Sequence, residues 1–345
     1  MVTDVPQHRA MQVTGAGEKL TLNRVEAPSL AAGQVRVAVH ACGVCNADAG
    51  TVTADRPEAG FPITPGHEVA GVIEELGEHV TGWQRGDRVA VGWFGGSCGH
   101  CTACRRGDVV HCPERQIPGL SYPGGWAESL TVPASALARI PDGLSMAEAA
   151  PFGCAGVATF NAVRNGGARP GGRVAVLGIG GLGHLAVQFA ARMGYDTIAI
   201  GRGPEKEDLA RSLGARHYID STGRQPGAAL RAMGGADLIV STAAATAPLA
   251  EAIDGLAPHG HLAVVGLDGE PLPVRLDKLI LHARTIGGHL TGSPADTEQA
   301  MRFALTNGIR PRIETLPLDG ANEALDAVLA GRARFRMVLT TGGRA

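Results

Sequence analysis

Short apolar runs separated by Gly and Pro fill the first part of the chain. Val35–Val39, Val69–Glu74 and Arg88–Val91 are examples, and turn residues lie between them. Apolar runs of this length, separated by turn residues, are typical of antiparallel strands rather than helices. The pattern predicts a barrel-like β domain over residues 1–156.

The pattern changes at residue 157, where apolar runs begin to alternate with helical stretches. The predicted strands are Val174–Leu177, Thr197–Ile200, Leu238–Val240 and Leu262–Val265. The predicted helices are Leu182–Met193, Glu205–Leu213 and Leu249–Leu256. Strands that alternate with helices predict a doubly wound parallel sheet, here over residues 157–290.

The last segment, residues 291–345, is predicted to hold two helices and a strand. These are Ala295–Thr306, Gly320–Ala330 and Arg336–Thr340. A chain of 345 residues is also longer than a single hydrophobic core usually accommodates, so two domains are expected.

Composition and charge narrow the class of protein. The formal net charge is −2, which gives no reason to expect nucleic acid or an anionic membrane as a partner. The first ten residues contain no apolar signal segment, and the most apolar long stretch, Val174–Met193, contains four glycines. We therefore expect a cytoplasmic protein that acts on a small-molecule substrate.

A glycine-rich loop directly follows the strand Val174–Leu177. It reads Gly178, Ile179, Gly180, Gly181, Leu182 and Gly183, and an amphipathic helix follows it. In a G-x-G-x-x-G loop the first glycine allows a tight turn and the second lets the backbone approach a pyrophosphate. The third lets helix and strand pack closely, and the helix N-terminus favours an anion. The segment predicts a dinucleotide site.

The end of the next strand indicates which dinucleotide binds. A carboxylate there would bind the ribose 2′-hydroxyl and repel a 2′-phosphate. This chain instead has Gly201 followed by Arg202, with Lys206 nearby. The residues favour NADP(H) over NAD(H). The alternative is that Arg202 is a solvated surface residue and both cofactors are accepted.

Four cysteines lie close together between about residues 95 and 115. They are Cys98, Cys101, Cys104 and Cys112. Four thiolates on short loops suit a closed, structural zinc site. An odd total of seven cysteines in a chain without a secretory signal argues against disulfides. The ferredoxin pattern has three residues before its last cysteine, whereas this chain has seven, which disfavours an iron–sulfur cluster.

Three further cysteines and a histidine are left over, namely Cys42, Cys45, Cys154 and His67. No local spacing unites them. Their spacing alone leaves two readings open, packed core residues or a metal site with an open position.

The order of five sequence motifs along the chain resembles that of a known protein family. The segments are Gly43-Val44-Cys45-Asn46-Ala47-Asp48, Gly66-His67-Glu68, the cysteine lobe, Cys154-Ala155-Gly156-Val157 and the glycine loop. Together they resemble the zinc-containing alcohol dehydrogenases of the medium-chain dehydrogenase/reductase family over nearly the whole chain. The resemblance implies a GroES-like, partly open β-barrel catalytic domain, to which residues 291–345 return, and a Rossmann cofactor domain. It also implies a homodimer or homotetramer.

The resemblance further implies a role for each matching residue. Cys45, His67 and Cys154 would bind a catalytic zinc, so that each chain holds two zinc ions. Glu68 would lie next to the metal as an exchanging ligand, and Asp48 would orient His67. Cys42 would be a small buried residue. Outside the metal site, Arg336 would reach the cofactor pyrophosphate, Val265, Gly266 and Leu290 would lie near the nicotinamide, and Trp93 would line the substrate pocket.

The chain departs from the family pattern at the proton relay. Ala47 stands where the family usually has Ser or Thr, and Gly50 stands where many members have His. Thr51 or water would have to replace the relay. The residues predict a zinc-dependent oxidoreductase acting on an alcohol, aldehyde or ketone with NADP(H). The alternatives are an NADPH-dependent reductase of an iminium or activated C=C bond, and a non-catalytic dinucleotide sensor.

Overall fold

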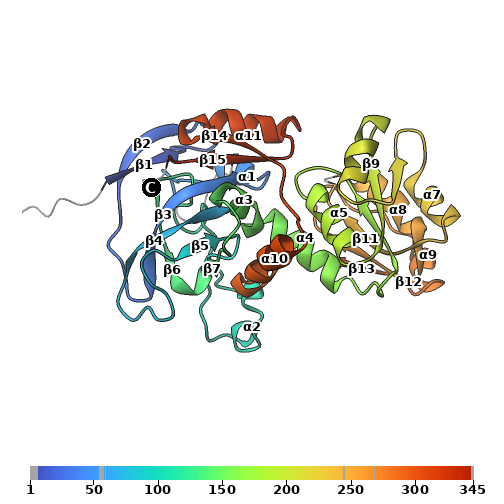
Figure 1. Ribbon diagram of the computed structural model, residues 1–345, viewed down its shortest axis with the longest axis horizontal. Helices are drawn as coiled ribbons and strands as arrows, with labels where there is room; N and C mark the ends of the chain where they lie inside the picture. Colours follow the sequence, from blue (N-terminus) through green and yellow to red (C-terminus); the bar gives the residue numbers. More distant parts are fainter. Residues whose placement is uncertain (1–6, 54–57, 59, 244, 267–268, 343–345) are drawn as a thin grey trace, which may run out of the picture. The chain divides into compact units, whose positions relative to one another are not determined.

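The computed structural model describes residues 7–53, 58, 60–243, 245–266 and 269–342, and the chain divides into two compact units (Figure 1). The first unit comprises residues 1–154, 291–305 and 311–345. The second comprises residues 155–290 and 306–310.

The first unit is built on a seven-stranded sheet with the path β14-β15-β3-β4-β5-β7, and β6 pairs with β3. The strands are β3 (Gln34–Val44), β4 (Val69–Leu76), β5 (Arg88–Val91), β6 (Ser129–Pro133), β7 (Ala138–Arg139), β14 (Ile313–Pro317) and β15 (Arg336–Thr340). All neighbours are antiparallel except β14 and β15, which are parallel. These two strands can be parallel because a helix, α11, connects them and returns the chain to the same end.

Shorter elements complete the first unit. A separate two-stranded sheet pairs β1 (Gln7–Gln12) with β2 (Thr21–Glu26). The helices are α1 (Asp48–Thr53), α2 (Thr102–Arg105), α3 (Met146–Ala149), α10 (Pro294–Thr306) and α11 (Ala321–Leu329). The short 3-10 helices are η1 (Val109–His111), η2 (Ala134–Ala136), η3 (Ala150–Gly153) and η6 (Leu318–Gly320). Apolar side chains from β3, β4 and β5 pack with Trp126 to form the core.

The second unit contains a six-stranded parallel sheet in the order β10-β9-β8-β11-β12-β13. The strands are β8 (Arg173–Leu177), β9 (Asp196–Gly201), β10 (His217–Asp220), β11 (Ala236–Ser241), β12 (Leu256–Val264) and β13 (Thr285–Gly288). The helices are α4 (Ala155–Asn165), α5 (Gly183–Arg192), η4 (Pro204–Lys206), α6 (Glu207–Ser212), α7 (Pro226–Ala232), α8 (Thr246–Ala252), η5 (Ile253–Gly255) and α9 (Leu276–Ile280). The predicted doubly wound parallel sheet is confirmed.

Alternate side chains of this sheet belong to a shared core. Ala175, Ile198 and Ile239 pack with Leu230 of α7 and Leu249 of α8. Helices lie on both sides of the strands, with α5 on one side and α8 on the other (Figure 1). Because both faces are covered, the inner strands β8, β9, β11 and β12 carry apolar runs, which is why these four were predicted from the sequence.

The bounds of some helices and strands agree with the prediction from the sequence, and others differ. β5 and β15 have the predicted bounds. The helix predicted over Leu249–Leu256 instead ends at Ala252, a 3-10 turn follows, and Leu256 begins β12. Within the described ranges no helix combines the length and the apolar character needed to cross a bilayer.

Candidate functional site

Two neighbouring strands of the first unit bring three of the four candidate metal-binding residues together. Cys45 directly follows β3, while His67 and Glu68 directly precede β4. Because β3 and β4 are antiparallel, the end of one lies beside the start of the other, and the Gly43 N–H donates to the Glu68 carbonyl at 2.8 Å. Cys154 joins them from the end of η3.

The four side chains form one compact cluster. One ligand atom from each of Cys45, His67, Glu68 and Cys154 lies within 4.8 Å of the others. His67 Nε2 and Glu68 Oε2 are buried and have no hydrogen-bond partner among the described residues. Buried polar atoms are normally paired, and thiolate, imidazole and carboxylate are the donors that Zn²⁺ takes. The donor set therefore fits a zinc ion.

Asp48, at the start of α1, fixes the orientation of His67. Its Oδ1 lies 3.0 Å from His67 Nδ1, and its Oδ2 accepts a hydrogen bond from the Cys45 N–H at 2.8 Å. Burial lowers the pKa of His67, but the charge and hydrogen bond of Asp48, together with Cys45, raise it well above its usual value. With Nδ1 held by Asp48, Nε2 is directed to the other three ligand candidates.

The acidic groups of the cluster compete for ionisation. A hydrogen bond from the Cys154 thiol lowers the pKa of Cys45 well below its usual value, and the same bond raises the pKa of Cys154. Burial raises the pKa of Glu68 to about 7, although Arg336 opposes this rise. Two thiols and a carboxyl in one buried cluster can all ionise only if a cation compensates them.

Arg336, the first residue of β15, contacts this cluster directly. Its Nη2 donates to Glu68 Oε1 and also to the Val44 carbonyl at 3.2 Å, and both Arg336 and Glu68 are buried. The sequence placed Arg336 at the cofactor pyrophosphate, a role that stays a prediction, and the ion pair was not foreseen. Breaking a buried charge pair leaves the remaining charge uncompensated, so this contact holds Glu68 in place.

The remaining predicted residues of the first unit lie around the cluster. The Trp93 ring meets His67 edge-on, with centroids 4.8 Å apart, and its Nε1 is buried without a partner among the described residues. Ala47 is exposed in the turn before α1, and Thr51 is buried within α1. Cys42 is buried in the core, as expected, and burial raises the pKa of its thiol.

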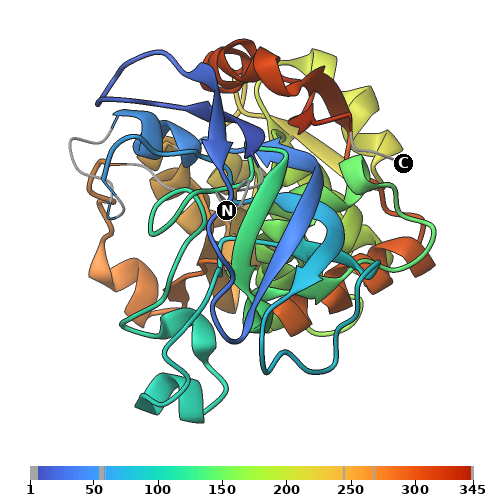
Figure 2. The same cartoon turned by 90° about the vertical axis from the view of Figure 1, so that its left-hand side faces the viewer.

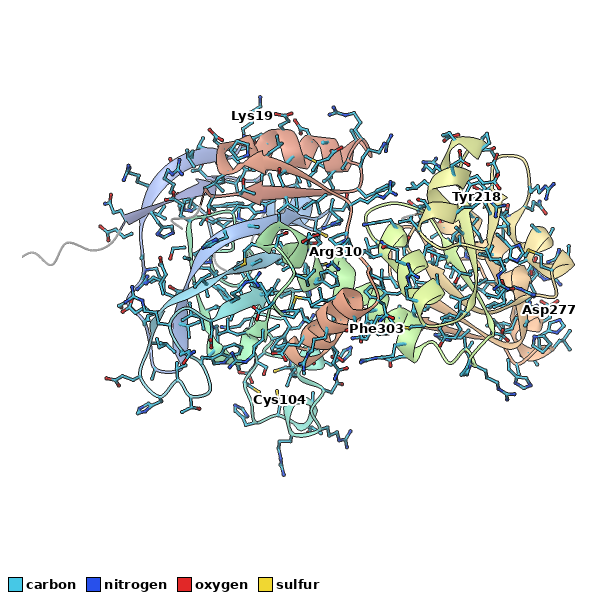
Figure 3. All side chains as sticks on the ribbon, viewed as in Figure 1. Lys19, Cys104, Tyr218, Asp277, Phe303 and Arg310 are labelled. Atoms are coloured by element: carbon cyan, nitrogen blue, oxygen red, sulfur yellow. The ribbon has the colours of Figure 1, made fainter. Side chains whose placement is uncertain are left out.

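The cysteine lobe forms a second candidate metal site. Cys98, Cys101, Cys104 and Cys112 are free thiols, and their sulfurs lie within 4.8 Å of one another. Figure 2 shows the lobe with α2 standing out from the strands of the first unit, and Cys104 is labelled there in Figure 3. Hydrogen bonding, chiefly with Ser97, lowers the pKa of Cys104 to about 7, which favours a thiolate. Four free cysteine sulfurs this close together fit a closed zinc site.

In the second unit, the glycine loop joins β8 to α5 as predicted. Gly178 has φ of +95°, which favours glycine. A Cβ at Gly183 would lie 1.8 Å from the Gly178 carbonyl oxygen, so the third glycine allows a close backbone approach. A Cβ at Gly180 would meet nothing within 4 Å. The open space at Gly180 is where the sequence expects the pyrophosphate to approach.

The different surroundings of these glycines predict different effects of the same substitution. Gly183→Ala should lower the free energy of unfolding by about 3 kcal/mol, because the Gly178 backbone must move. Gly180→Ala should leave stability within about 0.5 kcal/mol but weaken dinucleotide binding. Thermal unfolding and cofactor titration of both variants would check this. Equal losses of stability would contradict the assigned roles.

The other predicted cofactor residues lie at or near strand ends of the same unit. Gly201 ends β9, and the exposed Arg202 follows it. Lys206 ends η4. The N–H groups of Val265 and Gly266 both donate to the Ser241 carbonyl, at 2.9 and 3.0 Å. Leu290 is exposed.

A parallel sheet with a glycine loop, together with a buried thiol–imidazole cluster, defines the class of dinucleotide-dependent dehydrogenases with a metal site. Residues 31–142 match the alcohol dehydrogenase GroES-like domain, and residues 181–306 match the zinc-binding dehydrogenase domain. The chain belongs to the zinc-containing alcohol dehydrogenases of the medium-chain dehydrogenase/reductase family, and it is an oxidoreductase of that family.

Similar proteins span nearly the whole chain. Alcohol dehydrogenase patD from Penicillium expansum is 41% identical over 94% of this chain and 95% of its own length. NADP-dependent alcohol dehydrogenase C 1 from Mycolicibacterium smegmatis is 34% identical over 96% of this chain and 97% of its own length. The structure of a cinnamyl alcohol dehydrogenase from Sorghum bicolor superposes with a TM-score of 0.90 at 30% identity, covering 99% of both chains. The predicted GroES-like and Rossmann fold class is confirmed.

Proposed function

We propose that the protein is a zinc-dependent dehydrogenase that transfers hydride between NADP(H) and an alcohol, aldehyde or ketone. The observation that carries this proposal is the cluster of Cys45, His67, Glu68 and Cys154, in which His67 Nε2 and Glu68 Oε2 are buried without partners among the described residues. The names of the relatives support the substrate class, and the name of the Mycolicibacterium smegmatis relative supports NADP.

Each residue of the cluster has a separate task in this proposal. Cys45, His67 and Cys154 would hold the catalytic zinc, with Glu68 Oε2 as a further donor. When bound, the zinc supplies a Lewis acid for the substrate oxygen, and the nicotinamide supplies or accepts the hydride. Asp48 keeps the His67 ring oriented, and Arg336 holds the other oxygen of Glu68. The four thiols of the lobe would hold a second, structural zinc.

The route of the proton differs from the family pattern in this proposal. The methyl group of Ala47 can neither donate nor accept a proton, and Ala47 is exposed. A proton released from an alcohol would therefore pass to water or to the hydroxyl of Thr51. The Trp93 ring beside His67 would supply an aromatic wall for the substrate.

Metal analysis combined with a carbonyl and alcohol panel, run with NADPH and NADH, tests the proposal. We expect two zinc ions per chain and aldehyde or ketone reduction that chelation abolishes and added zinc restores. Activity confined to iminium or activated C=C substrates would replace the proposed substrate class. NADPH binding without turnover on the whole panel would indicate a non-catalytic protein.

Arg202 is the residue proposed to recognise the 2′-phosphate. Arg202→Ala should weaken NADPH binding by about ten- to a hundredfold, the effect of losing a charge-assisted hydrogen bond, and should change NADH binding little. Arg216→Ala is a matched control, because this exposed arginine lies at the opposite end of the strands, just before β10. Fluorescence titration with both cofactors measures the two affinities. An unchanged preference in Arg202→Ala would remove the residue from the proposal.

A further inference from the structure

The turn after β9, residues 201–203, is held from the neighbouring edge strand β10. The two strands are parallel, with Ala199 opposite Tyr218 and Gly201 opposite Asp220. Their carboxyl ends therefore lie side by side. Side chains at the end of β10 can reach the turn that carries Arg202.

Both backbone polar groups of Gly203 are bonded to side chains of β10. The Tyr218 hydroxyl donates to the Gly203 carbonyl at 2.6 Å, and Asp220 Oδ1 accepts from the Gly203 N–H at 2.9 Å. Ser221 secures the other end of the turn, since its N–H and Oγ donate to the Gly201 carbonyl at 2.8 and 2.9 Å. These bonds fix the backbone on each side of Arg202.

Gly201 is a glycine for reasons of space. Its φ is not in the left-handed region, so other residues could adopt its backbone conformation. A Cβ at this position would lie 2.7 Å from the Tyr218 hydroxyl oxygen and 3.2 Å from Tyr218 Cε2 and Ile179 Cδ1. These distances are shorter than the ~3.5 Å at which non-bonded carbon atoms attract. The Tyr218 side chain thus occupies the room that a side chain at 201 would need.

We propose that Tyr218 is a positioning residue for cofactor selectivity, an inference that rests on the proposed preference for NADP(H). Tyr218 (Figure 3) excludes a carboxylate from position 201, where it would bind a ribose 2′-hydroxyl, and it holds the turn that presents Arg202. An acid at 201 has to displace the Tyr218 hydroxyl and break its bond to Gly203.

The chemistry of the tyrosine suits this role. Burial, with Asp220 and the acidic residues Glu205 and Glu207, raises the pKa of Tyr218 to about 12. The hydroxyl therefore keeps its proton at neutral pH and remains a donor to the Gly203 carbonyl.

Binding constants for NADPH and NADH in a set of full-length variants test the inference. Tyr218→Phe should lower the ratio of NADPH to NADH affinity about three- to tenfold, because the turn loses one hydrogen bond. Tyr195→Phe is the matched control. Tyr195 lies just before the start of β9, away from the turn, and its hydroxyl donates to the Ala168 carbonyl. It should leave the ratio unchanged.

A double-mutant cycle separates the steric role from the hydrogen bond. Gly201→Ala should weaken NADPH binding about tenfold when Tyr218 is present and much less in the Tyr218→Phe background, where the closest contact is gone. Gly201→Asp should improve NADH binding only when combined with Tyr218→Phe. The alanine variant keeps the test valid if the aspartate variant does not fold.

The possible outcomes distinguish this inference from the proposed function. Equal affinity of the unmodified protein for NADPH and NADH would overturn the proposed preference for NADP(H) and, with it, the role of Tyr218. A preference for NADPH that Arg202→Ala abolishes, but that Tyr218→Phe changes no more than Tyr195→Phe does, would overturn only the role of Tyr218. The role of Tyr218 would also be overturned if Gly201→Ala weakened NADPH binding equally with Tyr218 present and in the Tyr218→Phe variant.

Discussion

Replacing Cys45 by alanine is expected to remove one zinc ion per chain and to lower kcat/KM for carbonyl reduction by at least about a thousandfold. Cys45 lies at the end of β3 within 4.8 Å of the other three ligand candidates. Without it, the site loses one of its two thiolates, and the remaining carboxylate donor, Glu68, is already paired with Arg336, so the ion is held much less tightly. Elemental analysis and steady-state kinetics on the same preparation would measure both effects.

Cys42→Ala provides the matched control for this experiment. Cys42 is a buried thiol within β3, three residues before Cys45, but it packs in the core and does not belong to the metal cluster. Its removal should cost about 1 kcal/mol of stability and leave the zinc content and activity unchanged. If Cys45→Ala kept the full zinc content, Cys45 would not be a ligand.

Cys101→Ala is expected to act on stability instead of chemistry. It should remove the other zinc ion and lower the melting temperature by about 5 °C or more, because structural zinc binding contributes directly to folding. The lobe has only short elements, and three of its four cysteines are half-buried, so little besides the metal would hold it together. Calorimetry and metal analysis would measure the change.

His100→Ala and limited proteolysis sharpen this second test. His100 is exposed and lies near Cys98, yet the four sulfurs already fill a tetrahedral site, so this variant should keep both zinc ions. In Cys101→Ala, trypsin should cleave faster at Arg105 and Arg106, which end α2. Unchanged cleavage and an unchanged melting temperature would show that the lobe needs no metal.

The parts of the fold that the sequence predicted are those with local signals. The glycine loop is continuous in sequence, and both flanking elements, β8 and α5, are strongly apolar. The edge strand β10 was missed, because only Ile219 of its four residues is fully buried. The strands β1 and β2 were missed for the same reason, since β1 has only two buried positions and β2 has none.

The candidate site shows a similar division between local and distant contacts. Cys45, His67, Glu68 and Cys154 were named as neighbours through the resemblance, because no spacing in the chain unites them. The pairing of Glu68 with Arg336 joins residues that are 268 positions apart, so no local pattern could indicate it. The contact of Tyr218 with the space beside Gly201 depends on the register of β9 and β10, which only the structure gives.

The position of β15 has a consequence for how the protein is made. Cys45, His67 and Glu68 are translated long before β15, which pairs with β3 through Met337 and Val44 and supplies Arg336. Until then the nascent chain exposes one edge of β3, and Glu68 lacks its cationic partner. The ion pair that holds Glu68 therefore forms only after β15 has been made, and a message truncated before codon 336 would yield a chain in which Glu68 lacks this partner.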